Sequence, residues 1–369
     1  MNETNIKRIE GGVTYPAGFR ASGIHCGLRK NKSKKDLALI LADKLCNAAA
    51  IYTTNKVYGA PITVTREHLK NGMARAAICN SGNANTCNPD GVDKANAMCA
   101  ALAAQLGIDE NDIIITSTGV IGEPLPLEPI LNGIPALCDS LGYDAENGYA
   151  AASAIMTTDT RLKQIAAETV IDGVKVKIGG MSKGSGMIQP NMATMLCFVT
   201  TDAHISSEAL QTLLKRVADR TFNMISVDGD TSTNDTFSVM EMHLSTTRTA
   251  KAAKPLKHFS NMSANIWHAK WRLTAKVHPS FSNAACMAAI RLKTHASLPN
   301  RSSIRRLSKR PCSARTPTGD VFYAHSAMPV WNLIRIKWTL ALSPTRARST
   351  SAKTAAASAL TRIKPKKFC

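Results

Sequence analysis

Apolar residues recur at helical spacing in two stretches of the first half of the chain. Residues 207–218 carry an apolar stripe formed by Leu210, Leu213, Leu214 and Val217. Ser207 is placed to cap the first free amides of that helix, and Glu208 suits the positive end of its dipole. Residues 96–106 are rich in strong helix formers and are followed by Gly107, a typical C-cap residue. The pattern therefore predicts helices over 96–106 and 207–218.

Short apolar runs alternate with these helices. Each run has Gly, Asn, Ser or Asp nearby, residue types that favour turns. The predicted strands are Ala76–Cys79, Asp112–Thr116, Val174–Ile178 and Leu196–Thr200. Alternating strands and helices predict an α/β or layered α+β fold and argue against an all-helical bundle.

The charge of the chain changes abruptly near Met240. Residues 1–240 contain 22 Lys and Arg against 24 Asp and Glu, net −2, whereas residues 241–369 contain 24 basic and 2 acidic residues, net +22. All but one of the 22 glycines precede this point. One interpretation of the basic tail is a nucleic-acid-binding appendage, in which bases stack on Trp267, Trp271, Trp331 and Trp338.

The spacing of the cysteines indicates whether the protein binds metal, and the lengths of the apolar runs indicate where in the cell it is located. The 10 cysteines include no Cys-x-x-Cys pair, which argues against a zinc site, and they are too sparse for a disulfide scaffold. No uninterrupted apolar run of about 18 residues is present, and the first residues lack the apolar segment of a secretory signal. We expect a cytoplasmic protein without a membrane span or bound metal.

Two polar, glycine-bearing segments fall where predicted strands end. Residues 80–85, Asn-Ser-Gly-Asn-Ala-Asn, suit a tight turn in which Gly and Asn reach positive φ. Residues 117–122, Ser-Thr-Gly-Val-Ile-Gly, form a turn whose successive N–H groups suit an oxyanion. For residues 117–122, a purely structural turn is an equally good explanation.

Two further polar segments resemble ligand loops but lack essential residues. Residues 179–186 resemble a nucleotide-phosphate loop, but Lys183 precedes Gly184 and Pro190 follows soon after, so they fail that comparison. The alternatives are a flexible glycine turn and a lysine that binds a substrate carboxylate. Residues 227–235 alternate oxygen-bearing side chains as a calcium loop does, without its required glycine and terminal glutamate. We interpret this segment as an acidic capping or substrate loop.

Thr194 supports the most specific chemical hypothesis. It follows a turn rich in Gly, Pro and Asn and begins an apolar run, so its hydroxyl could attack the carbonyl of Ala193 and cleave the chain. The new α-amine, with an ordinary pKa of about 7.7, could then act as general base for the Thr194 hydroxyl. The alternative is an ordinary β-forming threonine at the start of a strand.

Taken together, these segments resemble a known family over residues 10–240. The matching strings, in unbroken order, are GGVTYPAGFRASGIHCG, KKDLALI, YTTNKV, NSGNANTC, TSTGVIG, AIMTTDT, IGGMSKGSGMIQPNMATMLCFVTTDA and ISVDGDTSTNDT. The series is similar to that of the bifunctional ornithine acetyltransferase/N-acetylglutamate synthase family of arginine biosynthesis.

The resemblance implies a self-cleaving, N-terminal-threonine-nucleophile acyltransferase. Cleavage between Ala193 and Thr194 would give an α chain, 1–193, and a β chain beginning with the nucleophile Thr194, in an α₂β₂ heterotetramer. Thr118 and Gly119 match oxyanion-hole positions, and Thr157, Lys183 and Thr194 match substrate-binding positions. The implied substrates are N²-acetylornithine and glutamate, with acetyl-CoA as a donor in bifunctional members and no bound cofactor. A related self-cleaving aminopeptidase is the alternative enzyme.

After about Met240 the family pattern stops, and a frameshift explains the loss. Residues 314–325 can be encoded so that a shift of two bases yields Ala-Asp-Ala-Asn-Trp-Gly-Arg, a segment the family would have there. The same shift turns residues 274–283 into Gly-Glu-Gly-Ala-Pro-Lys-Leu-Phe-Glu, close to a missing substrate-binding motif. We therefore interpret 194–240 as the start of the β chain and 241–369 as a frameshifted, poorly ordered tail, which makes nucleic-acid binding the weaker interpretation.

Overall fold

The computed structural model describes residues 6–171, 174–187, 195–224 and 230–242. Its helices are α1 (Ala60–His68), α2 (Gly91–Leu106), α3 (Glu128–Asp139), α4 (Ala145–Ala154) and α5 (Ser207–Arg220). Its strands are β1 (Lys7–Ile9), β2 (Phe19–Ile24), β3 (Leu37–Tyr52), β4 (Met73–Asn83), β5 (Ile113–Val120), β6 (Lys163–Ile171), β7 (Val174–Lys183), β8 (Leu196–Thr201) and β9 (Thr236–Glu241). Short 3₁₀ turns follow or precede these elements at Leu69–Asn71, Glu110–Asp112 and Phe222–Met224.

Within the described ranges, nine strands form one mixed sheet. Its order is β1-β6-β7-β8-β9-β3-β4-β5, with β2 paired to β3. The pairs β4–β5 and β8–β9 are parallel, and the other neighbours are antiparallel. Parallel neighbours need crossover connections, and these are α2 between β4 and β5 and α5 between β8 and β9.

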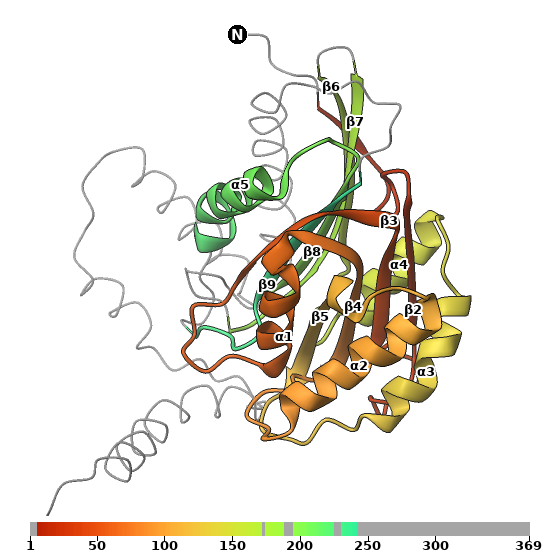
Figure 1. The fold of residues 1–369 in the computed structure, drawn as a ribbon, viewed down its shortest axis with the longest axis vertical. Coiled ribbons are helices and arrows are strands. Elements are labelled where there is room, and N and C mark those ends of the chain that lie inside the picture. Colours follow the sequence, from red (N-terminus) through yellow and green to blue (C-terminus); the bar gives the residue numbers. More distant parts are fainter. Residues whose placement is uncertain (1–5, 172–173, 188–194, 225–229, 243–369) are drawn as a thin grey trace, which may run out of the picture. The chain divides into compact units, whose positions relative to one another are not determined.

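The long strand β3 joins the two parts of the sheet. Its first half pairs with β2 and β4, its second half pairs with β9, and the register with β4 shifts between Leu41 and Cys46. An irregularity of this kind bends a strand and increases its twist. The bend lets one strand serve two sheet portions that carry different helices (Figure 1).

Three buried clusters show the layers. Helix α5 packs its leucines against Val199, Phe237 and their neighbours on one face of β8 and β9. Helix α2 packs against β5 and helix α3 packs against β2 and β3, and one buried cluster joins these elements to β4 through residues such as Leu102, Ile115 and Ile130. A middle cluster joins β3 and β4 to β7, β8 and α4. Residues of a strand alternate between faces, so both faces of the sheet are covered and the layered α/β prediction is confirmed.

Both predicted helices are present, one with an earlier start and one with a later end. Helix α2 begins at Gly91, five residues before the predicted start, and Gly107 ends it with φ of 64°. Helix α5 begins at Ser207, but the capping prediction was wrong: Ser206 accepts the bond from the Ala209 amide, and the Ser207 hydroxyl donates to the carbonyl of Gly72. Helices α1, α3 and α4 were not predicted, and none of the described helices is long and apolar enough to cross a membrane.

The predicted strands are present but longer. Strand β4 continues to Asn83, β5 to Val120 and β7 to Lys183, so most of the residues assigned to turns belong to strand ends. The reason is pairing: hydrogen bonds between neighbouring strands hold polar and glycine residues that have little strand propensity of their own. The polar segments therefore start from rigid sheet positions.

Candidate functional site

Two glycines meet where β4 and β5 end. Gly82 pairs with Gly119 in the parallel register. A Cβ atom built on Gly119 would lie 2.2 Å from the carbonyl carbon of Gly82, and Gly119 has φ of 140°. Both facts require glycine at position 119. The contact fixes the backbone beside Thr118, whose side chain is almost fully buried.

A hydrogen bond joins this turn to the end of β7. The Nζ atom of Lys183 donates to Oγ1 of Thr118 at 2.9 Å, across 65 residues of sequence. Lys183 is the last residue of β7 and is 3% exposed. Burial lowers the pKa of Lys183, and the nearby carboxylate of Asp159 opposes that shift. Two segments identified separately in the sequence thus form one polar site.

Asp159 connects Thr157 to the same site. Its Oδ2 accepts from the backbone N of Thr157 at 3.3 Å, and its Oδ1 accepts from the backbone N of Gly184 at 2.8 Å. Burial alone would raise the pKa of Asp159, but the charges of Lys183 and Lys163 and the bonds to this carboxylate hold it below its ordinary value. Three sequence-predicted positions, Thr118, Thr157 and Lys183, are therefore brought together.

Sequence reasoning missed Asn234, which fixes the Thr118 turn from the other side. Its Nδ2 donates to the carbonyls of Ala84 at 2.6 Å and Ser117 at 3.0 Å, while its Oδ1 accepts from the hydroxyls of Thr86 and Thr233. The segment 227–235 was identified as a polar loop, but no local signal distinguished Asn234. The residue is fully hydrogen-bonded in a buried position, which favours a structural role beside the site.

The predicted cleavage bond, Ala193–Thr194, lies outside the described residues. The next residue along the chain, Met195, is described, and its backbone N donates to Oδ1 of Asp235 at 2.8 Å. Asp235 is buried, and its pKa is raised well above the ordinary value by burial, against the attraction of Lys183. The β chain would therefore begin one residue before an amide fixed by Asp235.

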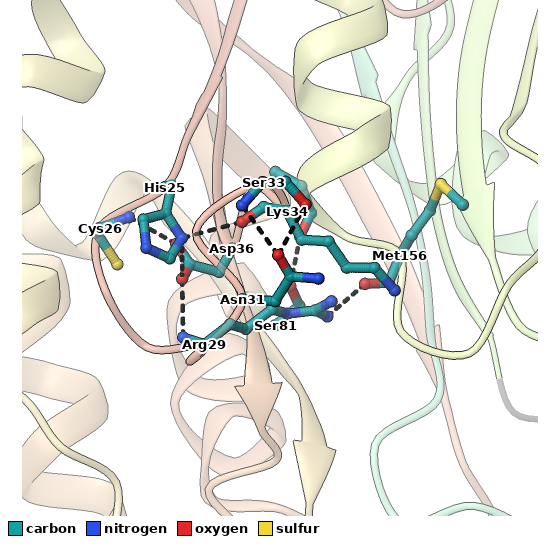
Figure 2. A network of polar contacts seen from close by, with 10 residues as sticks. His25, Cys26, Arg29, Asn31, Ser33, Lys34, Asp36, Ser81 and Met156 are labelled. Atoms are coloured by element: carbon teal, nitrogen blue, oxygen red, sulfur yellow. Dashed lines mark hydrogen bonds and ion pairs between the residues drawn. The ribbon is translucent and has the colours of Figure 1, made fainter.

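A polar loop braces the turn that precedes Thr157 (Figure 2). Buried Asp36 accepts from the backbone N of Cys26 at 2.6 Å and of Arg29 at 3.0 Å, so the loop between β2 and β3 closes on one carboxylate. The guanidinium of Arg29 then donates to the carbonyl of Met156. Since Met156 immediately precedes Thr157, this loop supports one wall of the site.

The described residues do not favour a reactive thiol or a metal ion at this site. Burial raises the pKa of Cys79, near Lys183, to about 12, so the thiol is protonated at neutral pH. No group of three or more His, Cys, Asp or Glu residues in the described ranges could hold a metal ion. A surface groove of about 810 Å³, lined in part by Asn47, Arg66 and Ser207, contains none of the predicted site residues.

The fold and the site define a layered α/β protein in which a buried ammonium, a hydroxyl and a strained glycine turn converge, a set suited to a carboxylate or a developing oxyanion. The model of the ArgJ family matches residues 20–278. The chain therefore belongs to the ArgJ family, which confirms the resemblance noted in the sequence. The match extends past Met240, where the sequence motifs end.

Individual relatives agree with the family match. The chain is 48% identical over 233 residues to the arginine biosynthesis bifunctional protein ArgJ of Caldanaerobacter subterraneus, covering 63% of this chain and 57% of the relative. It is 45% identical over 270 residues to the ArgJ protein of Bacillus cereus, covering 72% of this chain and 62% of the relative. It thus spans about three fifths of the length of these relatives.

One similar solved structure is the ornithine acetyltransferase of Mycobacterium tuberculosis in complex with ornithine. It is 34% identical, with a TM-score of 0.47, and the match covers 52% of this chain and all of that one.

Proposed function

We propose that the protein transfers an acetyl group from N²-acetyl-L-ornithine to L-glutamate, giving N-acetyl-L-glutamate. The observation that carries this proposal is the hydrogen bond between Lys183 and Thr118. It joins the segment that the family resemblance assigns to substrate binding with the segment assigned to the oxyanion hole. The names of the ArgJ relatives and the ornithine of the mycobacterial complex support this substrate class.

The direction of that hydrogen bond supports a role for Thr118 as a donor. An ammonium can only donate, so Lys183 uses an acceptor lone pair of the Thr118 oxygen. The single proton of the Thr118 hydroxyl remains available for another acceptor. An oxyanion that develops beside the turn would accept that proton and the amide N–H of Gly119.

Self-cleavage would create the nucleophile. The Thr194 hydroxyl oxygen bonds to the carbonyl carbon of Ala193, the peptide C–N bond breaks, and the nitrogen takes up the hydroxyl proton. Water then hydrolyses the resulting ester, releasing the Ala193 carboxylate and the Thr194 hydroxyl. The products are a chain 1–193 and a second chain whose N-terminus is Thr194.

Acetyl transfer would proceed in two half-reactions. The α-amine of Thr194, with an ordinary pKa of about 7.7, takes the hydroxyl proton while the oxygen attacks the acetyl carbon. The C–N bond to ornithine breaks and the departing nitrogen takes the proton, which leaves acetyl-Thr194. The amine of glutamate then attacks this ester, gives N-acetylglutamate and restores Thr194. Lys183 and Thr157 bind the amino-acid substrate.

The remaining expectations follow the same family. They are an α₂β₂ assembly in the cytoplasm, acetyl-CoA as a second acetyl donor and no bound cofactor, since the threonine itself carries the acetyl group. Residues 243–369 lie outside the described residues, so their predicted frameshift and lack of order stay predictions. If the frameshift is real, substrate contacts from the second half are missing and the chain has weak or no activity.

Intact mass spectrometry followed by an acetyl-transfer assay tests the proposal. The samples are this chain, its Thr194→Ala variant, and a variant in which the sequence after residue 240 is restored to the other reading frame. Isotope-labelled acetylornithine is supplied first without glutamate and then with it. A parallel reaction contains acetyl-CoA in place of acetylornithine.

We expect the frame-restored chain to be cut between Ala193 and Thr194 and to carry labelled acetyl on the Thr194 peptide. Adding glutamate should move the label to N-acetylglutamate, and Thr194→Ala should remain uncut. A frame-restored chain that is cut but takes no label from acetylornithine contradicts the proposed reaction. Full transfer by the chain as it stands contradicts the prediction that its second half is defective.

A further inference from the structure

A buried ion pair beside the candidate site has no part in the proposed reaction. The side chains of Asp159 and Lys163 form a salt bridge, and both are inaccessible to solvent. Lys163 also donates to the carbonyl of Gly184 at 2.8 Å, while the Gly184 amide donates to Asp159 at 2.8 Å. The pair therefore binds both backbone polar groups of the residue that follows Lys183.

The same pair also binds the turn that carries Thr157. The Thr157 amide donates to the second oxygen of Asp159 at 3.3 Å, and the hydroxyls of Thr158 and Ser185 lie 2.7 Å apart. The segment after α4 and the end of β7 are thus joined at several points around one carboxylate. Since both segments start from packed elements, the pair sets the distance between them.

We propose that Asp159 and Lys163 are positioning residues that aim Lys183 at Thr118 and hold Thr157 beside it. This inference rests on the proposed function, because it assigns the pair to the substrate-binding side of that site. Gly184 follows the last residue of β7 and has φ of 145°. Because glycine has wide conformational freedom, it restricts the direction of the backbone at the end of β7 less than another residue would. The bonds to Asp159 and Lys163 supply that restriction.

A need for stability alone does not explain why this pair is charged. Removing two charges from water has a large cost, and well-packed hydrophobic replacements of a buried ion pair are often as stable. The charge has a second effect here, because both members of the pair act on Lys183. Asp159 is the principal group that favours a protonated Lys183, while Lys163 opposes it.

The test uses the full chain and measures Lys183 directly. Acetic anhydride at a low concentration acetylates deprotonated, accessible lysines, and peptide mass spectrometry gives the rate at each lysine. The variants are Asp159→Asn, Lys163→Arg and the neutral double variant Asp159→Asn/Lys163→Gln. Exposed Lys70 supplies an internal control in every digest, and thermal unfolding of each variant reports on the fold.

In the double variant we expect near-native thermal unfolding and an increase of tenfold or more in labelling of Lys183, with Lys70 unchanged. Lys183 is more accessible when the pair no longer positions it at Thr118, and without Asp159 the pKa of Lys183 falls further. In Lys163→Arg, which keeps the charge, Lys183 should be labelled more slowly than in the double variant. A folded double variant in which Lys183 labels at the wild-type rate overturns the inference. If the double variant does not fold, Asp159→Asn decides: faster labelling of Lys183 than in the wild type supports the inference, and labelling at the wild-type rate overturns it.

Acetyl transfer separates this inference from the proposed function. In a frame-restored background, the double variant should lose about 10- to 100-fold in kcat/KM, because a misplaced binding group costs that much. The alkaline limb of its pH–rate profile should move to lower pH. Altered labelling without transfer in any sample leaves the positioning role and removes the proposed reaction. Wild-type transfer together with wild-type labelling in the double variant leaves the proposed reaction and removes the positioning role.

Discussion

The two sides of the candidate site are held by different kinds of interaction. On one side, Thr118 and Gly119 are fixed by backbone pairing, by a close contact between glycines and by the neutral amide of Asn234. On the other side, Lys183 is fixed through the buried charges of Asp159 and Lys163. The first side depends on shape and the second on charge.

This difference determines how each side fails. A glycine contact fails when any atom is added, because the neighbour is backbone and cannot move aside as a flexible side chain can. A buried ion pair fails when one partner is removed, because the remaining charge is left in a medium that cannot solvate it. The first three variants below separate these two behaviours and the fourth tests a buried carboxyl group outside the site, from the largest expected effect to the smallest.

Gly119→Ala should have the largest effect. The added Cβ would lie 2.2 Å from the carbonyl carbon of Gly82, and the residue would keep a positive φ. Strain and overlap together should lower the free energy of unfolding by roughly 3–6 kcal/mol. Gly107→Ala is the matched control, because Gly107 also has a positive φ but nothing lies within 4 Å of its added Cβ. A similar loss of unfolding free energy for both variants in urea would show that backbone strain, and not the overlap with Gly82, causes the destabilisation.

Lys163→Met tests the charged side. It removes the ammonium and leaves Asp159 buried, so the free energy of unfolding should fall by about 3–5 kcal/mol. Lys70→Met breaks an exposed pair with Glu67 and should cost less than about 0.5 kcal/mol. Denaturant unfolding of the two variants in parallel gives the comparison. Equal losses would contradict the importance assigned to the buried pair.

Asn234→Ala removes the amide that holds the neutral side. The carbonyls of Ala84 and Ser117 would lose a buried donor, at a cost of about 2–4 kcal/mol. Asn88→Ala is the control, since Asn88 donates a single bond to the carbonyl of Glu123 near the surface. We expect a thermal midpoint well below that of the control. A midpoint equal to the control would show that water replaces the lost amide.

Glu241→Gln should have the smallest effect, and that effect should depend on pH. Burial raises the pKa of Glu241 to about 7, although the bond from Asn47 opposes the shift. A raised carboxyl pKa stabilises the fold below the ordinary value of 4.5, and this contribution is lost as pH rises to about 7.

Between pH 5 and pH 8 the wild-type free energy of unfolding should therefore fall by roughly 2 kcal/mol from this group. The glutamine variant should show a shallower decline, because it cannot ionise. Asp202 and Asp235 have raised pKa values in the same direction, so some slope should persist. Unfolding curves at several pH values measure the slopes, and parallel curves for wild type and variant would contradict the assignment to Glu241.

The sequence predicted the parts of the site better than its connections. Glycine and lysine within polar segments indicated Gly119 and Lys183, because only a few residue types suit a strained turn or a carboxylate. Asn234 and Asp159 gave no such signal. Their importance depends on which carbonyls and amides the fold places around them, and no local pattern encodes that arrangement.

The sequence by itself determined the amphipathic stripe of α5, the family to which the chain belongs and the abrupt change of charge near Met240, because these are properties of neighbouring residues or of motif order. The tertiary structure decided that Lys183 meets Thr118 and that Asp159 joins Thr157 to Gly184. The contact of Lys183 with Thr118 spans 65 residues and that of Asp159 with Gly184 spans 25. Strands β5 and β7 are not neighbours in the sheet, so the ends that carry Thr118 and Lys183 meet only because the β3–β4 portion packs against β7 and β8.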